Sequence, residues 1–170
     1  QGFTHLGLTG ESGRQSHIKS TERMVAMAVD FAESHQCLCY LVLDAFFSAG
    51  SVFQARNYYS IEHKKPWVEI LTKAKNNTVG YFPAPPKPAG RPGRQAFYGE
   101  KVHLQECFDY PDLFETVSCQ VYGKTESIQV MSLTLLWRPI ADYVVFVLAV
   151  TSKGPIMWMS SDIAGDFVSQ

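Results

Sequence analysis

Residues 37–54 read CLCYLVLDAFFSAGSVFQ. Seven apolar residues (37–43) run into a single carboxylate, Asp44, and small residues follow at positions 48–51. An uninterrupted apolar run predicts a strand covered on both faces, as in the centre of a sheet flanked by helices. Asp44 then stands at the carboxyl end of that strand, where open α/β sheets collect ligands and catalytic groups.

The neighbouring segments complete an α/β unit. Apolar residues at helical spacing predict an amphipathic helix over 21–35, capped by Ser20 or Thr21. A second helix follows the small residues, and the stretch PWVEILTKAK (66–75) reads as another strand. A strand–helix–strand crossover normally joins parallel neighbours, so we expect a parallel pair.

The second half of the chain has a β pattern. Residues 76–99 hold most of the prolines, which predicts a long, partly extended loop instead of helix or central strand. Beyond the loop, about four β-branched and aromatic runs separated by turn signals predict an antiparallel meander. We therefore divide the chain into an α/β core (1–75), a loop with a β-rich insertion (76–160) and the start of a return helix (161–170).

Composition favours one globular unit without a membrane segment. Of 170 residues, 46% are hydrophobic, yet no apolar run approaches the roughly 18 residues that span a bilayer. The four cysteines and five histidines lack zinc-site spacing, so we expect reduced thiols and no zinc. The expected location is the cytoplasm.

Charge is concentrated in the middle of the chain. Residues 64–101 contain eight Lys/Arg against two Asp/Glu, a balance of +6, whereas the flanking segments are acidic. This block indicates either a surface that faces a polyanion or a solvated lysine-rich loop.

Two acids that follow apolar runs each leave two interpretations open. Asp44 either caps the helix near residues 46–51 or binds a divalent metal ion, with the small residues leaving room for a phosphate. Asp162 either opens a final helix or supplies a second metal ligand. Two-metal chemistry on phosphodiesters needs several carboxylates, so Asp44 cannot perform it alone.

Several blocks of the chain resemble one family. They are VLDAFFSAGSVF (42–53), the stretch from ILTKAKNN to GEKVHL (70–104), LFETVSCQVYGKTESIQVMSLTLLW (113–137) and FVLAVTSKGPIMWMSSDI (146–163). In this order they resemble the central part of a bacterial insertion-sequence transposase with a DDE domain. The resemblance implies a ribonuclease H-like fold interrupted by a β-rich insertion.

The resemblance also implies a catalytic site for two Mg²⁺ or Mn²⁺ ions. Asp44 matches the second aspartate of the triad, which makes it the expected catalytic residue and metal ligand. No motif of the first aspartate precedes Asp44, and the chain ends at Gln170 before the expected glutamate helix. We therefore expect a central fragment that does not assemble the two-metal site in isolation.

The family's partner is double-stranded DNA at transposon ends, bound by a homodimer in some complexes. By this resemblance Lys73 and Lys75 belong to a basic block on the DNA side, and Arg91, Arg94 and Lys101 continue it. Such side chains neutralise phosphates. Four aromatic residues in the same region either stack on distorted DNA or pack internally: Tyr81, Phe82, Phe97 and Tyr98.

Three functional hypotheses remain. The first is a DDE transposase fragment that, when complete, cleaves and joins DNA. The second is a non-catalytic DNA-binding or assembly remnant of a mobile element. The third is a small α/β phosphohydrolase using Asp44 and Asp162, which requires that both carboxylates reach one cation.

Overall fold

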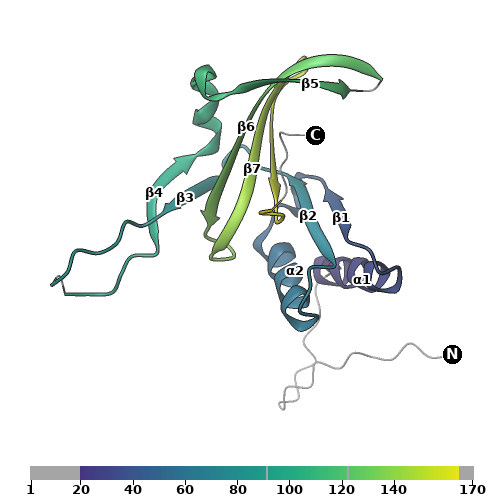
Figure 1. Ribbon diagram of the computed structural model, residues 1–170, viewed down its shortest axis with the longest axis horizontal. Helices are drawn as coiled ribbons and strands as arrows, with labels where there is room; N and C mark the ends of the chain where they lie inside the picture. The colour runs from purple at the N-terminus through teal and green to yellow at the C-terminus, as the bar shows by residue number, and fades with distance from the viewer. Residues whose placement is uncertain (1–19, 91, 122, 165–170) are drawn as a thin grey trace, which may run out of the picture.

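The computed structural model describes residues 20–90, 92–121 and 123–164. Within them, eight strands form one mostly antiparallel sheet in the order β1-β2-β8-β7-β6-β3-β4, with β5 paired to β6 (Figure 1). The fold is therefore mixed α/β. In chain order its elements are α1 (Ser20–Ser34), β1 (Cys39–Leu43), the 3-10 turn η1 (Ala45–Phe47), α2 (Gly50–Glu62), β2 (Val68–Lys73), β3 (Val79–Pro83), β4 (Tyr98–His103), η2 (Leu104–Asp109), η3 (Pro111–Leu113), β5 (Glu115–Val121), β6 (Lys124–Trp137), β7 (Asp142–Thr151) and β8 (Gly154–Ser160).

The first half follows the predicted helix–strand–helix–strand order. α1 begins and ends one residue before the predicted helix, and it buries Val25, Val29 and Ala32 at helical spacing. β1 and β2 pair in parallel, with Leu43 opposite Thr72. The crossover prediction is thus confirmed.

The main core lies between the two helices and the sheet. Val52 and Phe53 of α2 join Ile70 and Phe146 in one buried cluster, and Phe53 meets Trp137 edge-on at 5.3 Å between ring centroids. Burial of apolar area stabilises a fold by about 25 cal/mol per Å², and aromatic rings bury the largest areas per residue. The sheet segment that carries Asp44 is therefore anchored on its helix side.

The position predicted for β1 is wrong. β1 is the last strand of the sheet at one side and pairs with β2 alone among the described strands. Tyr40 and Val42 are 48% and 60% exposed, because the helices cover only the opposite face, where Leu41 packs against the core. An apolar run at every position thus marks an edge strand here, not a central one.

The prediction for residues 76–99 is only partly right. The extended loop is confined to 84–97, and the residues before it form β3, which lies between β6 and β4 in the sheet. The loop and its two strands form an arm that reaches away from the helices in Figure 1. We call residues 79–103 the β3–β4 arm.

The remaining strands match the predicted meander. β5 to β8 cover the four predicted runs, and β6, β7 and β8 are antiparallel neighbours. β8 also pairs antiparallel with β2, so the strands of 76–160 and the α/β unit share one sheet. Residues 161–164 form no helix, and residues 165–170 of the expected return helix lie outside the described residues.

Candidate functional site

Asp44 and Lys73 lie at the same end of the parallel strand pair. Leu43 is opposite Thr72 in the register, so Asp44, the first residue after β1, and Lys73, the last residue of β2, stand at the same end of the pair. Both side chains are exposed. An exposed acid and an exposed base thus stand at the carboxyl ends of two neighbouring parallel strands.

Asp44 caps η1. Its Oδ1 accepts a hydrogen bond of 2.9 Å from the backbone N–H of Phe46. Its carbonyl oxygen accepts the Thr72 hydroxyl at 2.6 Å and the Phe47 N–H at 3.1 Å. The capping interpretation is thus confirmed, for a 3-10 turn only: α2 begins after Ala49 with no side-chain cap.

Asp44 suits one metal bond but not a complete two-metal site. The Phe46 N–H engages one carboxylate oxygen, and a Mg²⁺ ion is commonly held by one or two carboxylates together with substrate phosphates. In the part of the chain that the structure describes, no group of three or more His, Cys, Asp or Glu side chains comes together. Asp44 would supply a single carboxylate to such an ion.

Asp162 follows β8 and lies beside Tyr40 of β1, away from Asp44. Its Oδ2 accepts the Tyr40 hydroxyl at 2.5 Å, and its Oδ1 accepts the Ala164 N–H at 3.1 Å. The hydrogen bond to Asp162, with a smaller contribution from burial, raises the pKa of Tyr40 to about 12. β8 runs antiparallel to β2, so Asp162 at its end meets the start of β1, four residues before Asp44. The shared-cation hypothesis gains no support from this arrangement.

A buried ionic network ties the layers together behind this strand pair. Arg56 of α2 forms an ion pair with Glu69 of β2, whose side chain is 6% exposed. The Ser161 hydroxyl donates to Glu69 at 2.5 Å and accepts the Ile70 N–H at 2.8 Å. Arg56 also donates to the Val68 carbonyl at 3.2 Å. Sequence reasoning missed this network, although a glutamate within the apolar run of β2 was a visible signal.

The predicted DNA-binding residues fall into two groups. Lys73 ends β2, and Lys75 lies in the turn to β3, where its carbonyl accepts the Thr78 N–H. Lys101 lies on β4, and Arg94 lies in the loop of the β3–β4 arm. All four side chains are exposed, whereas Arg91 lies outside the described residues.

The loop of the arm is braced across its width. Gln95 accepts the Lys87 N–H and donates to the Pro85 carbonyl, each at 2.8 Å. The Lys87 ammonium donates to the Gly93 carbonyl. A hollow of about 480 Å³ lies between the two sides of the loop, with Arg94 and Tyr98 in its lining.

The four aromatic residues of this region divide into two kinds. Tyr81 is buried and packs edge-on against Tyr98, with ring centroids 5.3 Å apart. Phe82 and Phe97 are exposed. Internal packing thus accounts for Tyr81, whereas the exposed rings remain able to meet a partner.

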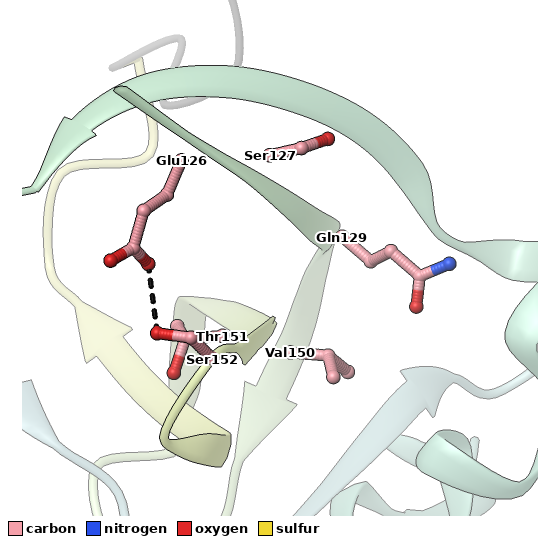
Figure 2. A pocket seen from close by; sticks show the side chains of 6 residues that line it. All are labelled: Glu126, Ser127, Gln129, Val150, Thr151 and Ser152. Atoms are coloured by element: carbon pink, nitrogen blue, oxygen red, sulfur yellow. Dashed lines mark hydrogen bonds between the residues drawn. The ribbon is translucent and has the colours of Figure 1, made fainter. Parts of the chain in front are cut away.

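A separate hollow lies near the start of β6 and the end of β7 (Figure 2). Its volume is about 470 Å³, and its lining is Glu126, Ser127, Gln129, Val150, Thr151 and Ser152. The Ser152 hydroxyl donates to Glu126 at 3.0 Å. Gln129 pairs with Val150 eight residues along β6 from Trp137, so this hollow is remote from the turn that follows Trp137.

Comparison with known proteins gives no family for the chain. Neither a family model nor a curated protein matches the sequence. None of the described helices is both long and apolar enough to cross a membrane.

Proposed function

We propose that this chain binds double-stranded DNA as part of a DDE transposase. In this proposal its strand pair belongs to a ribonuclease H-like core, and Asp44 is one of the ligands for Mg²⁺ or Mn²⁺. A single observation carries it: Asp44 and Lys73 stand at the same end of two neighbouring parallel strands, and both are exposed. A metal-binding carboxylate beside a phosphate-binding cation suits an enzyme that cuts DNA.

DNA binding is tested by removing the two lysines next to Asp44. We expect the double variant Lys73→Gln/Lys75→Gln to weaken binding to a short DNA duplex and to lower the slope of log affinity against log salt by up to about 1.8. Arg23→Gln/Lys124→Gln is the matched control, since it removes the same charge from exposed positions on α1 and β6. Equal losses in both variants would contradict a specific role of the lysines.

The metal-binding role of Asp44 has a separate test. In NMR spectra of the ¹⁵N-labelled chain, paramagnetic Mn²⁺ bound to Asp44 should broaden the amide signals of Ala45 and Phe46. Asp44→Asn should remove this broadening. In a chain extended by the two further carboxylates that the resemblance implies, Mg²⁺-dependent nicking should be lost in Asp44→Asn. Nicking that survives this change would refute the assignment.

The second candidate is a non-catalytic DNA-binding module. The engagement of one Asp44 oxygen as a cap favours it, since a structural role alone explains that contact. It predicts salt-sensitive DNA binding with no Asp44-dependent response to Mn²⁺. A homodimer on DNA is compatible with both candidates.

A further inference from the structure

Arg138 is a cation held in place by two aromatic rings. It follows Trp137 at the end of β6, and its guanidinium carbon lies 4.3 Å from the centre of the Tyr81 ring and 5.2 Å from that of Tyr98. The side chain is exposed, and it forms no ion pair within the described residues. These cation–π contacts hold the guanidinium carbon near the rings, and N–H groups at its edge can still donate to an acceptor.

A β-bulge brings a second cation to the same face. Tyr81 is opposite Lys101 and Pro83 is opposite Tyr98, so two steps along β3 match three along β4. The extra residue places Tyr98 and Lys101 on one face, although they are three positions apart. Gly99 allows this, because a Cβ there would lie 2.7 Å from the Pro83 carbonyl oxygen.

The turn after Arg138 packs against the segment that follows Asp44. Gln54 of α2 donates to the Pro139 carbonyl at 2.7 Å. At Gly50, the first residue of α2, an added Cβ would lie 2.7 Å from the Pro139 Cβ, so the two backbones touch. Lys73 is level with Ser132 of β6 through β8 and β7, so Arg138 lies towards the other end of the strands, beside Tyr81 of the β3–β4 arm.

We propose that Arg138 and Lys101 contact the phosphate backbone of double-stranded DNA and extend the basic surface of the β3–β4 arm to the end of β6. This inference rests on the proposed DNA binding. The guanidinium offers paired N–H donors that match phosphate oxygens, and its contacts with two rings lower the entropy lost on binding. The nearest acid in the turn, Asp142, accepts the Tyr143 N–H at 2.8 Å. Phosphate contacts of this kind give affinity without sequence preference.

The test compares single variants of the 170-residue chain. Binding of a mixed-sequence DNA duplex is measured by fluorescence anisotropy between 50 and 200 mM salt. We expect Arg138→Gln and Lys101→Gln each to weaken binding several-fold and to lower the log–log salt slope by about 0.9. Arg138→Lys keeps the charge but not the planar stack, so we expect an intermediate affinity with the slope nearly retained.

Arg23→Gln is the matched control, an exposed arginine on α1. Wild-type slopes in both Arg138→Gln and Lys101→Gln, with DNA binding intact, would overturn this inference and leave the proposed function standing. Equal losses in Arg23→Gln, or equal affinity of the wild type for heparin, would also overturn it. Absence of DNA binding by the wild type would refute the proposed function itself. Lys101→Gln leaves the ring stack untouched, so it decides the question if Arg138→Gln fails to fold.

Discussion

At the scale of the residue, Asp44 has a structural role as a cap and a proposed chemical role as a metal ligand. One carboxylate oxygen caps η1 through the Phe46 N–H, and the side chain remains exposed. Asparagine offers the same cap through its amide oxygen but carries no charge. Substitution by asparagine therefore isolates the charge, and substitution by alanine removes both features.

We expect Asp44→Ala to lower the free energy of unfolding by about 1 kcal/mol, because the Phe46 N–H loses its partner. Asp44→Asn should unfold within about 0.5 kcal/mol of the wild type. Urea denaturation followed by circular dichroism measures both. Equal destabilisation by the two changes would mean that the charge of Asp44, not the cap, stabilises the fold.

Tyr40 is the residue whose titration reports the contact with Asp162. The pKa of Tyr40 is raised to about 12, first by this hydrogen bond and then by burial, against about 10 for an unfolded tyrosine. A raised pKa favours the neutral phenol in the folded state. Its contribution to stability is therefore fully present below about pH 10 and is lost as pH rises through about 12.

NMR titration of ¹³Cζ-labelled tyrosine measures this pKa, with Tyr40→Phe to assign the signal. At about pH 11 we expect Tyr40 to remain mostly protonated. Asp162→Asn should move its pKa down towards about 10, because the anionic acceptor is lost. An unchanged pKa in Asp162→Asn would show that the contact does not form in solution.

At the scale of the element, the ion pair between Arg56 and Glu69 joins α2 to β2 and, through Ser161, to the end of β8. Removing one partner leaves the other buried without compensation. The same pair thus fixes how the helix lies against the strands that carry Asp44 and Lys73.

We expect Arg56→Met to destabilise the chain by about 3–5 kcal/mol, since Glu69 is then a buried, unpaired carboxylate. The double variant Arg56→Met/Glu69→Gln should recover part of the loss, because glutamine is neutral and still accepts from Ser161. Arg23→Met on the surface of α1 is the control, with a change within about 0.5 kcal/mol. A decrease in the free energy of unfolding of about 0.5 kcal/mol or less in Arg56→Met would show that the ion pair does not stabilise the fold.

Local patterns predicted the elements well, and long-range partners less so. The helix of α1 and the meander of β6 to β8 are visible in the sequence because periodicity and turn residues are local signals. The edge position of β1 and the insertion of β3 between β6 and β4 depend on which strands meet, which no local pattern encodes.

The same limit applies to the candidate site. Asp44 was predicted because it stands at the end of an apolar run, and Lys73 because it belongs to a basic block that resembles one in the transposases. Arg138 was missed, because its role depends on Tyr81 and on a bulge in β4 that brings Tyr98 beside it. The contact between Tyr40 and Asp162 joins residues 122 positions apart, beyond any spacing rule.

At the scale of the whole molecule, β1 is a strand at the edge of the sheet. β7 lies between β6 and β8, whereas β1 pairs with β2 alone among the described strands. β1 carries no charge and no proline, which are the features that usually protect a sheet edge from further pairing. The edge of the sheet next to Asp44 therefore lacks these protective features.

Amide hydrogen exchange can measure this openness residue by residue. The Cys39 N–H donates to the Trp67 carbonyl, so N–H groups at odd positions of β1 face β2 and those at even positions face outward. In the free chain we expect the amides of Tyr40 and Val42 to exchange at rates near those of an unstructured peptide. The amide of Leu41 should be protected, and those of β7 should be the slowest, because exchange there requires opening of the central sheet.

Dilution of the sample then separates two explanations of any protection at the edge. Protection of Tyr40 and Val42 that disappears on dilution would mean that a second chain pairs with β1. Protection that persists at every concentration would contradict the free edge. Asp44 directly follows β1, so a second strand paired with β1 would also hold the Asp44 carboxylate more firmly. The broadening of the Ala45 and Phe46 amide signals by Mn²⁺ should then increase as well.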